Sequence, residues 1–438
     1  MPWRSVLDPQ RRVAAATVAR EVVVRSTDPE YRSVALAAAR RQTQFPSALR
    51  WDPYGIAAGD AGLAVLCAHM DAWLPGERWD VLAHGFLTVA AREAERAPRV
   101  PPGLFGGLSG LAFATASLSR GGARYQQLLS GLDEVLAPQA VACGERLRSG
   151  HGRGGVSEFD VISGASGIGV YLLERDAHGV LPQILSGLVS LAEPQAKPPR
   201  WMTPPQLLGD ESLVRLCPWG GLNCGLAHGI PGPLALLALA LRAGLEVPGQ
   251  DEAVRELADW LLAHRADDEW GVNWPAVVPL PSPDAPQLDP RLEPCRSAWC
   301  YGSPGVARAL WFAGDALDDA GLRELAVEAM HAVLRRPVRQ RRIESPTLCH
   351  GVAGLLQIVL RFAHDTGLAA FSDAAADLVD QLLAAYEPER PLAYASLEPG
   401  PNPVDHAGLL DGAPGIAMAL LAAATDTEPT WDRLFLLS

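Results

Sequence analysis

The sequence has 438 residues, of which 48% are hydrophobic and 20% charged; this balance excludes a disordered chain and predicts a large buried core. The formal net charge of −13 at pH 7 argues against a nucleic-acid-binding surface, because phosphate backbones are bound by clustered Lys and Arg side chains. The sequence has no run of about 18 apolar residues, so no membrane span is expected.

The N-terminal stretch, MPWRSVLDPQRRVAAATVAR, has arginines on both sides of an alanine-rich segment and lacks the apolar core of a signal peptide. The chain contains seven scattered cysteines. An odd number of cysteines in a long chain favours reduced thiols or metal ligands over a disulfide framework. Both features predict a cytoplasmic protein.

One short pattern recurs seven times along the chain: G-x-x-G followed by small and branched apolar residues. The seven repeats begin, in chain order, at Gly59, Gly107, Gly164, Gly229, Gly302, Gly351 and Gly412. Glycine supplies freedom of φ and close backbone approach at a turn, and Pro or Ser suits a first helical turn. Each turn is therefore expected to lead into a helix, which is buried because the residues that follow are apolar nearly all round.

Amphipathic stretches lie between the repeats, at 251–265, 321–336 and 371–387. Their charged residues fall on one face, as in an outer helix with one side in water. The alternation predicts an all-α fold, an α/α toroid of seven inner and seven outer helices. The repeats run from about 55 to 425, so we expect one domain over residues 1–438. On pattern alone, an open helical solenoid is the alternative.

Two proline-rich segments, 197–221 and 275–299, cannot be helical throughout, because proline removes a backbone donor and clashes with the preceding turn. Each segment leads directly into a glycine turn. We expect both to be long loops over one end of the toroid rather than domain linkers, and loops of this length are usually functional.

Reactive side chains concentrate just before the glycine turns. In the seven repeats the residue before the first Gly is Ala58, Gly106, Ser163, His228, Tyr301, His350 and Asp411. The residue one earlier is Cys300 in the fifth repeat and Cys349 in the sixth. Equivalent turns of a toroid converge at one end of its axis, so these residues can meet. Two thiolates and an imidazole form a common Zn²⁺ set with an open fourth position; Cys300, Cys349 and His350 are therefore predicted to bind one Zn²⁺ per chain.

At these turns the sequence resembles a known family. GLAHGIPG (225–232), AWCYGSPG (298–305) and LCHGVAG (348–354) look like the three signature motifs of the lanthionine cyclases, the LanC-like enzymes. PWGGLNCGLAHG (218–229) and CRSAWCYG (295–302) extend the match. Together with the repeats and the length, the resemblance covers essentially the whole chain.

The resemblance implies a stand-alone zinc enzyme with an α/α toroid fold. Such an enzyme closes thioether rings by adding cysteine thiols to dehydroalanine or dehydrobutyrine in a precursor peptide. By motif position, the three residues of the predicted zinc set take the ligand role, and active-site roles fall to His228, Arg296, Tyr301 and Asp160. The expected partners are the dehydrated precursor peptide with its leader, a separate dehydratase and a transporter.

The chemistry of the residues agrees with this function. A free thiol is only a few per cent thiolate at pH 7, whereas a zinc-bound thiol is deprotonated outright. Attack on the alkene leaves an enolate that needs stabilisation and a proton. Imidazoles titrate near neutral pH, which suits His228 as the proton donor. Arg296 is suited to stabilise the enolate oxygen, and Asp160 to orient His228 or polarise a water.

Structural roles are the alternatives for these four residues. His228 fits a core or helix-capping histidine, Arg296 and Asp160 fit ordinary ion pairs, and Tyr301 fits packing alone.

Two other functions fit parts of the pattern. The β-subunits of protein prenyltransferases are zinc-dependent α/α barrels that alkylate thiols, but their ligand set includes an aspartate and lacks this Cys plus Cys-His pairing. A LanC-like protein that binds glutathione or a peptide without cyclising it would share the zinc motifs. A requirement for an isoprenyl diphosphate would indicate the first, whereas lanthionine formation from a dehydrated peptide would exclude it. A neighbouring gene for a dehydratase would discriminate between a cyclase and the second.

Further polar residues near the turns are expected to be structural. Cys224 and Cys295 lie off the ligand register. Asp405 and His406 are expected in a turn, and Asp411 is expected to cap the next helix.

Overall fold

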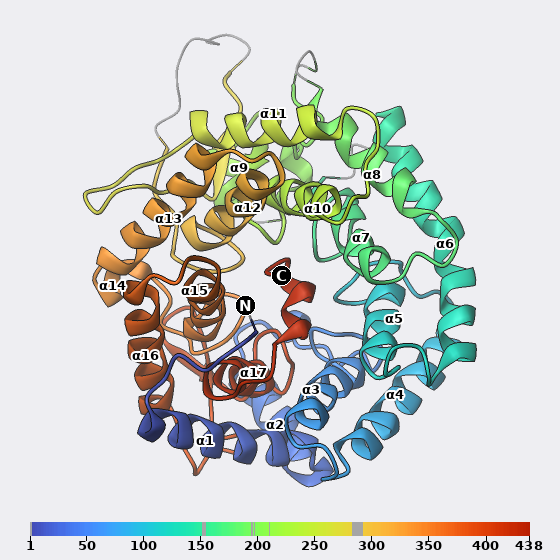
Figure 1. Ribbon diagram of the computed structural model, residues 1–438, viewed down its shortest axis with the longest axis vertical. Coiled ribbons are helices and arrows are strands. Elements are labelled where there is room, and N and C mark those ends of the chain that lie inside the picture. The colour runs from blue at the N-terminus through green and yellow to red at the C-terminus, as the bar shows by residue number, and fades with distance from the viewer. Residues whose placement is uncertain (1, 151–154, 194–195, 197, 210, 283–291) are drawn as a thin grey trace.

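The computed structural model describes residues 2–150, 155–193, 196, 198–209, 211–282 and 292–438. Within this part of the chain, the helices form two concentric rings (Figure 1). The inner ring comprises α3 (Asp60–Trp73), α5 (Leu108–Ser117), α7 (Ala165–Glu174), α10 (Pro231–Arg242), α12 (Ser303–Ala316), α15 (Val352–Thr366) and α17 (Ala413–Ala424). The outer ring comprises α1 (Pro9–Thr27), α4 (Trp79–Arg96), α6 (Gln126–Ser149), α8 (Leu181–Val189), α11 (Gln250–Ala263), α13 (Ala320–Arg335) and α16 (Ala369–Ala384). The predicted toroid of seven inner and seven outer helices is confirmed for the described residues.

The remaining elements belong to neither ring. They are the helices α2 (Pro29–Gln42), α9 (Glu211–Leu216) and α14 (Val338–Arg341), and the 3₁₀ segments η1 (Pro46–Ala48), η2 (Val156–Glu158), η3 (Ser190–Ala192), η4 (Pro205–Leu207) and η5 (Thr430–Phe435). Strand β1 (Gly221–Asn223) pairs antiparallel with β2 (Val277–Pro279), and β3 (Ser396–Glu398) with β4 (Asn402–Val404). The first pair joins the two proline-rich segments to each other.

The helices of the two rings differ in burial, as their sequences predict. Every residue of α17 is buried, as expected for a helix that is apolar all round. The amphipathic stretches form α11, α13 and α16, which bury one face against the inner ring and expose the other. No helix in the described ranges is both long and apolar enough to cross a membrane.

The ring closes through the N-terminal helix. Helix α1 packs against α17, the last inner helix, and α17 in turn contacts α3, the first (Figure 1). The indole Nε1 of Trp3 donates to the carbonyl of Ala422 at 3.0 Å, which fixes the start of the chain to the end of α17. The alternative of an open solenoid is therefore wrong.

Besides the two rings of helices, backbone hydrogen bonds join the seven turns in a closed ring, called the backbone ring below. The participating residues lie two positions before the first glycine of each repeat, and they are Ala57, Phe105, Ile162, Ala227, Cys300, Cys349 and Leu410. Each N–H donates to the carbonyl of the next residue in this series at 3.0–3.3 Å, and Leu410 donates back to Ala57; between the third and fourth turns the donor is Val161. All seven turns are thus held in one register at one end of the toroid.

The glycines of the turns are required mainly by close approach. Gly302 has a φ of 109°, but Gly59 is extended, with φ at −174°. A Cβ on Gly59 would lie 1.9 Å from the carbonyl oxygen of Asp52, and one on Gly62 would lie 2.3 Å from that of Ile56. The expectation that the first glycine supplies freedom of φ therefore holds at Gly302 and is wrong at Gly59, where backbone packing excludes a side chain.

The C-terminal segment fills the middle of the toroid (Figure 1). Asp432, in η5, is fully buried and accepts two hydrogen bonds from the Arg361 guanidinium, at 2.6 and 2.7 Å. The Nε1 of Trp299 donates to the carbonyl of Phe435 at 2.9 Å. Because Trp299 precedes Cys300, this segment supports the turn that carries one of the predicted zinc ligands.

Candidate metal centre

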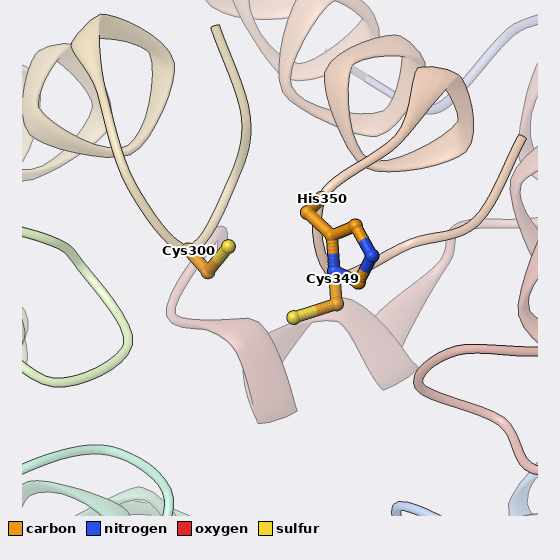
Figure 2. A group of neighbouring side chains, drawn as sticks. All are labelled: Cys300, Cys349 and His350. Atoms are coloured by element: carbon orange, nitrogen blue, oxygen red, sulfur yellow. The ribbon is translucent and has the colours of Figure 1, made fainter. Parts of the chain in front are cut away.

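The backbone ring brings the two predicted thiol ligands together. The N–H of Cys300 donates to the carbonyl of Cys349 at 3.2 Å, and the N–H of Cys349 donates to Leu410 at 3.1 Å. Cys300, Cys349 and His350 each offer a ligand atom, and these atoms all lie within 4.8 Å of one another. Figure 2 shows their side chains converging from the turns that precede α12 and α15.

The chemistry of this donor set fits Zn²⁺. Hydrogen bonding with Cys300, burial of the sulfur and the nearby Cys300 thiol together raise the pKa of Cys349 well above its ordinary value. Two thiols this close cannot both ionise unless a cation offsets the repulsion between them. A bound Zn²⁺ offsets it and deprotonates coordinating thiols, and a Cys₂His set leaves one position open, as in catalytic sites.

A histidine–aspartate pair lies on the neighbouring turns. The Nδ1 of His228 is 2.6 Å from Oδ2 of Asp160. Asp160 is only 1% exposed, and its Oδ1 accepts from the N–H groups of Ser163 and Gly164 at 2.7 and 2.8 Å. With Nδ1 donating to Asp160, the other ring nitrogen, Nε2, is left to exchange protons with a bound molecule.

Tyr301 is held by a residue that the sequence analysis did not identify. The Nδ2 of Asn223, at the end of β1, donates to the Tyr301 hydroxyl at 2.9 Å, and its Oδ1 accepts from the N–H of Gly225. Burial raises the pKa of Tyr301 to about 12, so its hydroxyl stays protonated at neutral pH. Asn223 lies within the quoted motif PWGGLNCGLAHG, but its role follows only from pairing across 78 residues of chain.

The three predicted zinc ligands and the other four candidate residues lie around one end of the toroid. A cavity of about 720 Å³ is lined by the three ligands and by His228, Arg296 and Tyr301. Asp160 does not line the cavity but lies behind His228. Arg296 is exposed and has no ion-pair partner among the described residues, unlike the structural ion pair considered for it. Its positive charge opposes the rise in the pKa of Cys349.

The two proline-rich segments form part of the walls of this cavity. Thr203, Leu207, Leu208 and Leu213 line it from the first segment, and Ala276, Val277 and Cys295 from the second. The prediction that these segments lie over one end of the toroid is confirmed for the described residues. The parts of the segments at 197, 210 and 283–291 lie outside the described residues.

Of the remaining polar residues near the turns, some have structural roles and others lie at the cavity. Cys224 is fully buried, as expected of a structural cysteine, whereas Cys295 lines the cavity. Asp405 accepts from the side chain of Gln42 at 2.7 Å and is structural. Asp411 does not cap α17, because the N-cap is the next residue, Gly412. The Oδ1 of Asp411 lies 3.5 Å from Nδ1 of His350.

The architecture and motifs of this site are those of a known family. The sequence pattern of the lanthionine synthetase C-like proteins matches residues 50–436, which is most of the chain. The chain belongs to this family. All seven repeats of the LanC-like chain lie within the matched residues.

This LanC-like chain is also similar to two individual proteins. The chain is 26% identical to the nisin biosynthesis protein NisC of Lactococcus lactis subsp. lactis over 274 residues, which cover 59% of this chain and 62% of that protein. Among solved structures, a chain described as nisin cyclase superposes with a TM-score of 0.74 at 19% identity, covering 93% of this chain and 96% of that one. The structural likeness shows the shared toroid fold.

Proposed function

We propose that this LanC-like chain is a lanthipeptide cyclase, which adds cysteine thiols to dehydroalanine or dehydrobutyrine and so forms (methyl)lanthionine rings in a precursor peptide. The observation that carries the proposal is that the Cys300, Cys349 and His350 cluster lines the same cavity as His228, which Asp160 orients. Membership of the family and the partial similarity to NisC support it.

Cys300, Cys349 and His350 would hold one Zn²⁺ per chain, and that ion would supply the Lewis acidity that converts the peptide thiol to a thiolate. The addition forms one C–S bond at the β-carbon of the dehydro residue and breaks the C=C π bond. A proton is added at the α-carbon, so the balance is an isomerisation with no leaving group.

Three further side chains complete the proposed reaction. The Nε2 of His228 carries the proton to the α-carbon, while Asp160 holds the opposite side of the ring at 2.6 Å. The Arg296 guanidinium lies at the cavity lining without an ion-pair partner among the described residues, and it stabilises the developing enolate oxygen. Tyr301, fixed through Asn223, positions the peptide through its protonated hydroxyl.

The wider context is also part of the proposal. Residues 1–438 act as one domain in the cytoplasm, and the substrate is a dehydrated precursor peptide with its leader. A separate dehydratase prepares this peptide, and a transporter exports the product. The odd number of free cysteines supports a reducing compartment.

The test uses a synthetic peptide in which one dehydroalanine and one cysteine are separated by a few residues. The zinc-loaded chain should remove the free thiol without changing the peptide mass, faster than the heat-inactivated chain does. The remaining free thiol is measured by alkylation followed by mass spectrometry. A thiol that persists while zinc and peptide are both bound would instead indicate the binding protein without cyclase activity.

A further inference from the structure

A second cavity adjoins the zinc cavity. Its volume is about 310 Å³, and it shares Ile162 and Asp411 with the zinc cavity. Trp51, Phe105 and His406 contribute to its walls. None of its residues belongs to the proposed zinc set, and the proposed reaction gives the cavity no role.

The second cavity follows from the small size of the residues that precede three of the turns. The first three turns place small residues there, Ala58, Gly106 and Ser163, and all three line the second cavity. The equivalent residues His228 and His350 line the zinc cavity. The backbone ring holds all seven turns in one register, so equivalent residues lie at the same level around the ring. On the side of the first three turns, small residues at this level leave the second cavity. On the side of the later turns, the reactive side chains occupy the same level.

The lining of the second cavity suits an uncharged, apolar group. Leu36, Leu49 and Phe105 provide apolar walls. Trp51 is fixed in place because its Nε1 donates to the buried carboxylate of Asp60 at 3.1 Å. Tryptophan held in this way is a frequent anchor in binding sites, and the volume lies at the lower end of the range of about 300–1,000 Å³ typical of ligand pockets.

Two of the charged side chains in the lining form an ion pair. The Arg50 guanidinium lies 3.8 Å from the Asp52 carboxylate, and both side chains are exposed to solvent. Ser163, His406 and Asp411 complete the polar part of the wall, and the Asp411 carboxylate adds a negative charge at the side shared with the zinc cavity. A strongly charged ligand therefore finds no unopposed charge of the opposite sign in the Arg50–Asp52 part of the cavity.

We propose that the second cavity is a subsite for the precursor peptide, in which an apolar residue flanking the reacting pair binds. The inference rests on the proposed function, because it takes the peptide that reacts in the zinc cavity as its ligand. Ring closure brings two residues of one chain together, so the flanking chain has to leave the reaction centre. The second cavity adjoins the reaction centre, with Ile162 and Asp411 in the walls of both cavities.

Gly106 offers a direct way to fill this subsite. Among the described residues no heavy atom lies within 4 Å of a Cβ built there, so Gly106→Leu adds a side chain at the cavity wall without a backbone clash. Ser163→Leu fills the same cavity from the neighbouring turn. Gly85→Leu, on the exposed face of outer helix α4, is the matched control, since a Cβ there also meets nothing within 4 Å.

The experiment compares a core probe peptide, with dehydroalanine and cysteine only, with probes that carry a Phe-Leu extension at either end. The wild-type chain should cyclise one extended probe with a kcat/KM about tenfold above that of the core probe, as expected for burial of an apolar side chain. Gly106→Leu and Ser163→Leu should reduce this ratio to about one, and Gly85→Leu should retain it. Zinc content and thermal unfolding of each variant are measured in parallel.

A binding measurement separates this inference from the proposed function. A fluorescein-labelled extended probe, with alanine for dehydroalanine and serine for cysteine, cannot react, and its Kd should rise about tenfold in Gly106→Leu. Gly106-dependent binding without any cyclisation of the reactive probes would contradict the proposed cyclase and leave the subsite in place. Equal kcat/KM for core and extended probes in the wild type, or an unchanged ratio in both filling variants, would overturn the subsite.

Discussion

Asp160 uses both carboxylate oxygens to fix His228 on its turn. One oxygen receives two backbone N–H groups, and the other lies 2.6 Å from the imidazole. The first interaction sets the position of the carboxylate, and the second sets which ring nitrogen carries a proton. At the scale of single residues, the proposed proton transfer thus depends on a side chain that does not line the cavity.

Asp160→Asn should therefore lower the rate of cyclisation and leave zinc in place. The amide presents an N–H to Nδ1 of His228, so Nδ1 can no longer hold a proton when Nε2 gives its own to the α-carbon. We expect a loss of roughly 10²–10⁴ in kcat, the usual contribution of a general acid or base, and a similar loss for His228→Ala. Cyclisation kinetics and elemental analysis are measured together, and loss of zinc in either variant would contradict the assigned roles.

Asp411 is placed to orient His350. Its Oδ1 is buried, has no hydrogen-bond partner among the described residues and lies 3.5 Å from the His350 ring. Carboxylates behind metal-bound histidines fix the orientation of the ring, and their loss typically weakens metal binding 10- to 100-fold. Asp411→Ala should thus lower zinc affinity by about this factor in competition with a chelator, and Asp411→Asn by less. Unchanged affinity in the alanine variant would show that His350 needs no such support.

Among the elements, the inner helices begin at turns that exclude side chains. A Cβ on Gly354, in the first turn of α15, would lie 2.0 Å from the carbonyl oxygen of Leu348, next to the ligand Cys349. Gly85, in outer helix α4, faces open space. Replacement of glycine by alanine is therefore expected to have opposite effects on stability at the two positions.

Gly354→Ala should lower the free energy of unfolding by about 1–3 kcal/mol, as overpacking does. Gly85→Ala should raise it by about 0.5–1 kcal/mol, because alanine favours an exposed helix. Denaturant unfolding of both variants measures the two changes. Equal effects at the two positions would contradict the close approach at the inner turns.

Sequence alone could predict the inner helices and the metal ligands, because apolar runs and G-x-x-G turns recur and because Cys300 and Cys349 share one register. It could not predict that Asn223 holds Tyr301 or that Asp411 lies beside His350. Those contacts cross from one turn to another, and their geometry depends on how the turns pack. The small residues before the first three turns were visible in the sequence, but the cavity they leave required the closed ring.

For the whole molecule, closure and filling of the toroid depend on the two ends of the chain. Helix α1 supplies the seventh outer helix and η5 fills the centre. The repeat pattern contained neither feature, because each is a contact between segments that lie far apart in the sequence. His69, on inner helix α3, is one of the buried groups facing this central segment, with its ring edge-on to Trp431 at 6.4 Å.

Burial lowers the pKa of His69 from its ordinary value of 6.5 to about 4. Between these values the unfolded state binds a proton that the folded state excludes, so stability is lost as the pH falls from 6.5 towards 4. The loss is on the order of 3 kcal/mol for a shift of this size. His69→Phe should unfold with correspondingly weaker pH dependence over this range in denaturant titrations. Parallel curves for the wild type and the variant would contradict the burial of a neutral imidazole at this position.

The central claim is that Cys300 and Cys349, brought together by the closed ring of turns, bind zinc with His350. Elemental analysis of the purified wild type and of a variant with both Cys300→Ala and Cys349→Ala tests it most directly. One zinc per chain in the wild type and none in the variant is the predicted result. A wild type that contains no zinc after preparation in zinc-supplemented medium, or a variant that retains it, would contradict the account.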